Sequence, residues 1–245
     1  MTDHPIIFSA PMVRALLAGR KTMTRRLLYT KRKARNGIVP ASATVMQGYP
    51  PPIGCPDEYW TLSGWQNVKA GDRLWVREAA AFIDNSEFGQ PSYWQYRADT
   101  DGECLPGDWP DDEKDNPDRP RWRPCIHMPR DASRLTLIVT AVKIERLWNI
   151  SKRDCEAEGV EFETADPPFW YVPGIMPHSL TAVGIEERGD LMPHAVQSFR
   201  KLWIYLHGRE GWDANPFVVA PTFRVVKANI DAPEAAATRP NRENN

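Results

Sequence analysis

Cysteine is scarce in this chain, and its cysteines are widely spaced. The 245 residues include four cysteines, and no two of them form a CxxC pair. Neither a zinc ribbon nor a thioredoxin-like redox centre is therefore indicated. Cys125 and His127 are the one close Cys/His pair. An ordinary thiol and imidazole at a strand edge is a better interpretation of this pair than a metal site. We expect a reduced chain with no metal and no other cofactor.

Long apolar runs are also missing. No segment approaches the length of a membrane span, and no apolar run of signal-peptide type stands near the start. These absences predict a cytoplasmic protein with no membrane partner. Because 42% of the residues are hydrophobic, a chain of 245 residues can bury one substantial core, so we expect one domain. The sequence carries no signal for an oligomeric state.

Acidic residues are absent from a long stretch near the start. None lies between Asp3 and Asp57, whereas basic residues are frequent there. They are Arg14, Arg20, Lys21, Arg25, Arg26, Lys31, Arg32, Lys33 and Arg35. Unpaired like charges repel, so a fold that gathers them gains most when an anion such as phosphate neutralises them. A solvated surface is the alternative interpretation. A Pro- and Gly-rich segment, 99–118, carries the opposite charge and is expected to be a solvated loop.

Sparse strands alternate with single helices along the chain. Gly19 and Gly159 are typical helix stops, and Ser151 with Asp154 forms a capping-box pattern. The expected strands cover 6–8, 22–26, 74–77, 135–142 and 215–227, the last as one bent strand or a pair; the expected helices cover 9–18, 151–158 and 193–207, the last ended by Gly208.

Three segments rich in Pro and Gly look like insertions with little regular structure. They span about 27–68, 84–124 and 160–192. Residues 1–228 are then predicted to form the single domain, and 229–245 a disordered polar tail. The element order has no regular β-α-β repeat. It predicts an α+β fold, a small mixed β-barrel with helices at its rim.

The segment "GRKTMTRR", residues 19–26, combines a helix stop with a basic cluster and a hydroxyl. Nucleophilic catalysis needs an activated hydroxyl, a base and a group that stabilises developing negative charge. Thr24 and Lys21 meet part of that requirement. Residues three apart point to opposite faces of a strand, so Lys21 is expected in the turn after Gly19.

The third candidate is an acid in the short helix 151–158. Glu158 lies in its last turn, where the helix dipole disfavours a negative charge and so favours a carboxyl group suited to proton transfer. An ordinary exposed helix glutamate is the simpler interpretation. Glu156 and Glu161 are alternatives that spacing does not exclude.

Several basic and aromatic residues are candidates to contact a nucleic acid. Arg20, Arg25 and Arg26 can hold phosphates, and Trp75 with Arg77 can contact a base or the backbone. Most of the ten tryptophans are expected in the core.

Four motifs together resemble the ASCH domain, a relative of the PUA domain of RNA-modification proteins. They read "LLAGRKTMTRR", "VKAGDRLWVRE", "LTLIVTAVKIERL" and "SKRDCEAEGV", and the resemblance covers about half of the chain. Closely similar longer chains are uncharacterised proteins common in phage and prophage genomes, which would place the protein in a host-cell cytoplasm. The resemblance implies a five- or six-stranded PUA-like β-barrel with helices flanking a cleft for a nucleoside or RNA.

The resemblance also implies an activity. Some small ASCH members are amidohydrolases that remove the acetyl group from N4-acetylcytidine with a lysine, a threonine and a glutamate, which correspond here to Lys21, Thr24 and Glu158. Arg25 departs from the pattern, because the small enzymes tend to carry an apolar residue there. Other members are associated with RNA cleavage. The hypotheses are an amidohydrolase, a ribonuclease, a non-catalytic RNA- or DNA-binding module, and a structural phage protein with a vestigial cleft.

Overall fold

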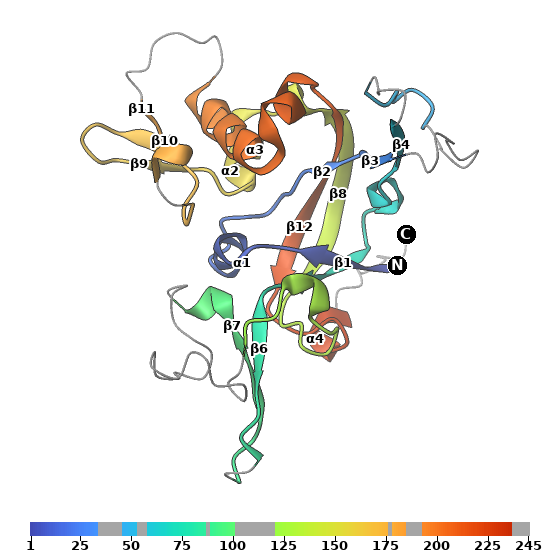
Figure 1. The fold of residues 1–245 in the computed structure, drawn as a ribbon, viewed down its shortest axis with the longest axis vertical. Coiled ribbons are helices and arrows are strands. Elements are labelled where there is room, and N and C mark those ends of the chain that lie inside the picture. The colour runs from blue at the N-terminus through green and yellow to red at the C-terminus, as the bar shows by residue number, and fades with distance from the viewer. Residues whose placement is uncertain are drawn as a thin grey trace, which may run out of the picture. The chain divides into compact units, whose positions relative to one another are not determined.

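The chain is a mixed α+β fold with several sheets and few helices (Figure 1). The structure, a computed structural model, describes residues 1–33, 46–52, 58–86, 89–100, 121–175, 178–184 and 193–236. Within these ranges no sheet closes on itself, so the barrel expected from the sequence stays a prediction. Cys55, Cys104 and the acidic residues 101–118 lie outside the described residues.

The chain divides into two compact units. Unit 1 comprises 1–19, 71–138 and 224–245, and unit 2 comprises 20–70 and 139–223. Two strands begin in one unit and end in the other, β8 (Thr136–Arg146) and β12 (Phe217–Val226). The single domain that the sequence pattern predicts stays a prediction.

Unit 1 is built around a sheet with the strand order β1-β5-β8. Strand β1 (Asp3–Ile7) runs parallel to β5 (Arg73–Arg77), and β5 runs antiparallel to β8. A separate hairpin joins β6 (Ala80–Ile83) to β7 (Tyr93–Tyr96) and is the long green arm of Figure 1. The predicted strand at 74–77 is confirmed, with Leu74 and Val76 buried on one face.

The first helix follows the pattern that the sequence predicts. Helix α1 (Ala10–Leu17) begins after Ser9, has a proline in its first turn and buries Val13 and Leu16. It ends at Leu17, and Gly19 follows with a φ of 73°, in the left-handed region that favours glycine.

Unit 2 holds the strand order β8-β12-β2 and two helices. Its strands β2 (Arg26–Leu27) and β12 are antiparallel. Helix α2 (Lys152–Ala157) packs against α3 (His194–Asp213), and α3 also contacts a small sheet of order β11-β10-β9 (Figure 1). These three strands are β9 (Glu161–Glu163), β10 (Phe169–Tyr171) and β11 (Val183–Gly184).

All three expected insertions contain regular structure. Within 27–68, β3 (Tyr29–Lys33) pairs antiparallel with β4 (Glu58–Leu62); strand β7 lies within 84–124, and the three-stranded sheet lies within 160–192. The prediction of little regular structure is therefore wrong for these parts of each insertion. Their prolines and glycines stand beside short strands, and proline is tolerated at strand edges and ends.

The predicted strand over 22–26 is largely wrong. Only Arg26 belongs to a strand, and Met23 forms one isolated bridge with Thr222. The backbone of 22–23 instead bonds to the end of α2, as described below. The pattern over 215–227 is one strand, β12, which passes through Pro221.

Helix α3 is interrupted at the glycine that the sequence predicts as its end. Gly208 is non-helical, with φ 76° and ψ 164°, so the first helical segment stops there as predicted, and a second segment continues to Asp213. In the second segment Trp212 is buried, and the indole N–H of Trp203 donates to the carbonyl oxygen of Gly211 at 3.2 Å. Tertiary packing therefore supports a further helical segment that the sequence pattern does not predict.

Residues 229–236 are ordered, against the expectation of a disordered tail. Ile230 is fully buried, and Asn229 Nδ2 donates to three backbone carbonyls between Arg130 and Ser133. A short helix, α4 (Pro233–Ala236), follows. Residues 237–245 lie outside the described residues.

Candidate functional site

Residues 21–24 are fixed between the end of α2 and strand β12. The backbone N–H groups of Thr22 and Met23 both donate to the carbonyl oxygen of Ala157, at 2.8 and 3.0 Å. On the other side, Phe223 donates to Thr22 at 2.8 Å, and Thr24 donates to the carbonyl oxygen of Pro221 at 3.2 Å. The segment therefore satisfies a carbonyl that the helix end leaves without an intrahelical donor.

Helix α2 presents Glu158 at its C-terminal cap. Ser151 and Asp154 form the predicted capping box, with both of its hydrogen bonds present. Gly159 has φ 99°, which turns the chain directly after Glu158. The capping residues thus determine where the helix begins and ends, and with it where this carboxylate lies.

Lys21 and Glu158 form a buried ion pair. The Lys21 ammonium group donates to Glu158 Oε2 at 2.6 Å and to the Glu158 carbonyl oxygen at 2.8 Å. The two residues are 2% and 9% exposed. Burial lowers the pKa of Lys21 below its ordinary value, although the Glu158 carboxylate acts in the opposite direction. An amine of lowered pKa can give up and accept a proton more readily near neutral pH.

Arg25 lies inside the protein and faces three carboxylates. It is 4% exposed, and it pairs with Glu158 at 3.3 Å, with Glu145 at 2.8 Å and with Asp154 at 3.0 Å. Burial opposes its charge, but the surrounding carboxylates outweigh that effect, so the pKa of Arg25 lies above its ordinary value. Its guanidinium group therefore holds the acids in place, Glu158 among them.

Lys143, whose side chain is 40% exposed, completes this network on its outer side. Its ammonium group lies 2.8 Å from Asp154 Oδ2 and 3.1 Å from Glu145 Oε1. Burial alone would raise the pKa of Asp154, but the hydrogen bonds from Lys143 and Ser151 and the charge of Arg25 lower it to about 2. Three cations and three carboxylates thus neutralise one another.

Thr24 lies three residues after Lys21 and is held through its backbone. It is 3% exposed, and among the described residues its hydroxyl is not part of the Lys21–Glu158 hydrogen bonds. The two alternative acids lie elsewhere: Glu156 is exposed and pairs with Lys152 at 3.9 Å, and Glu161 pairs with Arg20.

The predicted binding residues fall in both units. In unit 2, Arg26 is half-buried with its guanidinium group 5.8 Å from the Trp65 ring centroid, and burial lowers the pKa of Arg26. In unit 1, Arg77 lies 5.3 Å from the ring centroid of Trp75, and its guanidinium group also donates to the carbonyl oxygen of Ile126. Each unit therefore has one arginine stacked near a tryptophan.

Sequence reasoning missed the acids and the lysine around Arg25. Lys143 and Glu145 are two apart on β8, so strand alternation predicts that they share a face. Asp154 was assigned to the capping box alone. The Oδ2 atom that accepts from the backbone N–H of Ser151 also accepts from Lys143 and pairs with Arg25. Strand alternation was the sequence signal that could have placed Lys143 and Glu145 on one face. The contact between β8 and α2 is long-range, so no pattern of neighbouring residues predicts it.

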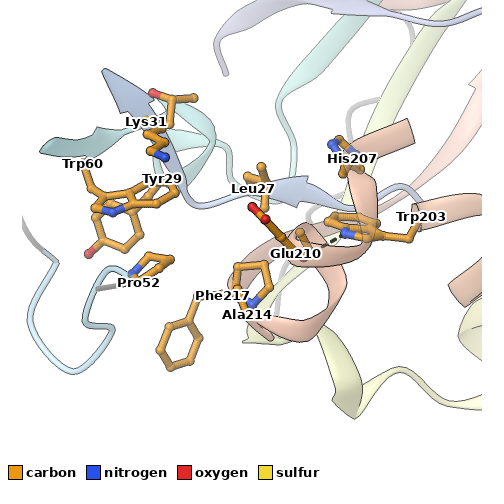
Figure 2. Close-up of a pocket in the computed structure, with 13 residues that line it drawn as sticks. Leu27, Tyr29, Lys31, Pro52, Trp60, Trp203, His207, Glu210, Ala214 and Phe217 are labelled. Atoms are coloured by element: carbon orange, nitrogen blue, oxygen red, sulfur yellow. Dashed lines mark hydrogen bonds between the residues drawn. The ribbon is translucent and has the colours of Figure 1, made fainter. Parts of the chain in front are cut away.

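Unit 2 also contains a cavity of about 520 Å³. Aromatic residues Tyr29, Trp60, Trp203 and Phe217 line it, together with Glu210 and His207 of α3 (Figure 2). In Figure 2 the Glu210 carboxylate points into the space that separates Tyr29 and Trp60 from Trp203. The helical spacing of Trp203 and His207 was a sequence signal for one wall, but Glu210 follows the non-helical Gly208 and has no such signal.

No family model, curated protein or solved structure matches the chain. In the part of the chain that the structure describes, no helix is both long and apolar enough to traverse a bilayer. Cys125 and Cys155 are free thiols, and burial raises the pKa of Cys155 to about 12, which makes it a poor nucleophile.

Proposed function

We propose that the protein binds a nucleoside or nucleic acid and hydrolyses an amide on a modified base, as in an ASCH-type amidohydrolase with a PUA-like barrel. The observation that supports it is the contact of 2.6 Å between Lys21 Nζ and Glu158 Oε2, two residues 137 positions apart. The resemblance of the motifs implies this pair, and Thr24 lies on the same fixed segment.

The pair has the properties that amide hydrolysis needs. In its neutral form the Lys21 amine accepts the proton of the Thr24 hydroxyl, or of a water that Thr24 orients, as the oxygen bonds to the amide carbon. The resulting ammonium group stabilises the oxyanion. The Lys21 ammonium group then passes this proton to the Glu158 carboxylate that it contacts, and Glu158 delivers it to the departing nitrogen as the C–N bond breaks. Water supplies the hydroxyl of the acid product, and the amine leaves with its added proton.

Arg25 serves this reaction by positioning Glu158. Its contact with Glu158 Oε1 leaves the other oxygen to Lys21. Since Arg25 is enclosed by carboxylates, we assign contact with phosphates to the more exposed Arg20 and Arg26.

The decisive test is incubation of the purified chain with N4-acetylcytidine, with cytidine and acetate measured by mass spectrometry. We expect turnover in the wild type, loss of at least about 100-fold in Thr24→Ala and Glu158→Gln, and no loss in Glu156→Gln, an exposed acid in the same helix. Absence of turnover in the folded wild type would contradict the hydrolase.

A non-catalytic binding module is the second candidate, and the enclosure of the pair favours it. Lys21, Thr24 and Arg25 are each no more than 4% exposed, so a substrate reaches them only after a local opening. This candidate predicts binding of a labelled RNA or DNA oligonucleotide without turnover or cleavage, with an affinity that falls as salt rises. Cleavage of the RNA in the same experiment would indicate a ribonuclease instead.

A further inference from the structure

The cavity of unit 2 is a site separate from the buried ion-pair network. Its lining includes neither Lys21, Thr24 nor Glu158. Trp60 and Tyr29 lie on one side of the space in Figure 2, and Trp203 lies on the other. Trp203 is buried and its ring packs against His207, at 4.4 Å between centroids, so the aromatic wall available to a ligand is that of Tyr29 and Trp60. A flat aromatic wall suits a flat ring that stacks on it.

Glu210 provides the polar group of the cavity. Its carboxylate points into the space, and within the described residues it makes no ion pair or side-chain hydrogen bond. A carboxylate only accepts hydrogen bonds, and its best partner is a fork of two parallel N–H donors. The ligand should therefore carry two adjacent N–H groups on the edge of a flat ring.

The surrounding charges select a neutral ligand. Lys31 lines the same cavity. Partial burial lowers the pKa of His207, and the positive charge of Arg26 lowers it further, so the imidazole is neutral at neutral pH. Positive charges beside the cavity repel a cation such as a guanidinium group. The ligand that fits these conditions is a neutral ring with two adjacent N–H donors.

We propose that this cavity binds a guanine-type base. The ring N–H and the adjacent amino group donate to the two oxygens of Glu210, and one face of the ring stacks on Trp60. The volume of about 520 Å³ lies within the usual range for small-molecule sites. The inference rests on the proposed function in one respect, that the ligand is a nucleobase. It adds that this base is of the guanine type.

Binding of nucleosides to the full chain tests the proposal, with tryptophan fluorescence and calorimetry as readouts. We expect guanosine to bind at least about 10-fold more tightly than inosine, which lacks the amino group, and than adenosine, which lacks the ring N–H. Methylguanidinium should bind more weakly still.

Variants assign the binding to this cavity. Glu210→Gln replaces one acceptor by a donor and should weaken guanosine binding at least about 10-fold. Trp60→Ala should weaken it about 10-fold through lost stacking. Asp213→Asn is the matched control, because Asp213 is an exposed acid of the same helix outside the lining, and it should bind guanosine like the wild type.

Three results would overturn the proposal. They are equal affinities for adenosine and guanosine, tighter binding of methylguanidinium, and no binding of any nucleoside by the folded protein. A folded Glu210→Gln variant with unchanged affinity would do so as well. Guanosine binding without turnover of N4-acetylcytidine contradicts only the hydrolase, and turnover without guanosine binding contradicts only this site.

Discussion

At the scale of single residues, burial changes the meaning of the basic cluster at 19–26. Counted along the sequence, these cations have no acids near them, and repulsion favours an anionic ligand. In the folded chain Lys21 and Arg25 meet carboxylates from β8 and α2 instead. Breaking a buried pair leaves an uncompensated charge, which costs more than the pair itself contributes.

Glu158→Gln should therefore destabilise the protein by about 3 kcal/mol. The substitution leaves the buried Lys21 charge with a neutral amide, and Arg25 loses one of its carboxylates. Urea unfolding at neutral pH measures the change. Glu156→Gln, at an exposed position of the same helix, should stay within about 0.5 kcal/mol of the wild type. Similar losses in both variants would show that the pair does not carry the effect.

Asp154 should make stability depend on acid. Its pKa falls from 3.8 in the unfolded chain to about 2 in the folded chain, so the unfolded state takes up a proton first as the pH drops. The stabilisation is complete above about pH 4 and is lost between pH 4 and 2. Asp154→Asn should flatten the fall in unfolding free energy over this window, as measured by urea unfolding at several pH values; a slope equal to that of the wild type contradicts the assignment.

At the scale of elements, capping residues determine where the helices place their functional groups. Gly159 turns the chain after Glu158, and Gly208 interrupts α3 between Trp203 and Glu210. His207 and Glu210, on either side of Gly208, both line the cavity. Gly208 ends one helical segment and a second segment follows it.

Gly208→Ala should cost about 1–3 kcal/mol, because φ 76° with ψ 164° is a conformation that residues with a Cβ rarely adopt. No atom lies within 4 Å of the added Cβ, so the loss comes from the backbone alone. Thermal unfolding measures it. Gly184→Ala has equal space and no positive φ, and it should change stability by less than about 0.5 kcal/mol. An unchanged stability in Gly208→Ala would mean that the kink is not required.

At the scale of the whole molecule, segments far apart in sequence close each unit. In unit 1, residues 229–231 return to 130–133, and the Arg73 guanidinium group donates to the carbonyl oxygen of Ile230 at 2.9 Å. In unit 2, residues 20–24 join α2 and β12. Contacts between segments this far apart leave no signal in the local sequence. Composition alone therefore predicted disorder for residues 229–236.

Ile230→Ala should destabilise the protein by about 2–5 kcal/mol through loss of buried apolar surface and the cavity left behind. Its side chain is fully buried although it lies in the expected tail. Chemical denaturation followed by circular dichroism gives the difference. Glu234→Ala, exposed four residues later, should lie within about 0.5 kcal/mol of the wild type. A small effect of Ile230→Ala would mean that this segment adds little to the fold.

The sequence by itself determined the features that depend on neighbouring residues. Helix α1 with its glycine stop, the capping box of α2 and the alternation of β5 all follow from interactions within a few positions. The motifs also pointed to Lys21 and Glu158 through their resemblance to a known domain.

Only the tertiary structure decided the surroundings of these residues. Lys21 meets Glu158 across 137 positions, and Arg25 meets Glu145 across 120. The packing of α2, β8 and β12 buries both residues. It lowers the pKa of Lys21 through burial and brings Arg25 into contact with carboxylates. The same holds for the cavity, whose walls come from β3, β4, α3 and β12. Hydrogen-bond geometry and desolvation depend on distance in space, and a pattern along the chain specifies only distance in sequence.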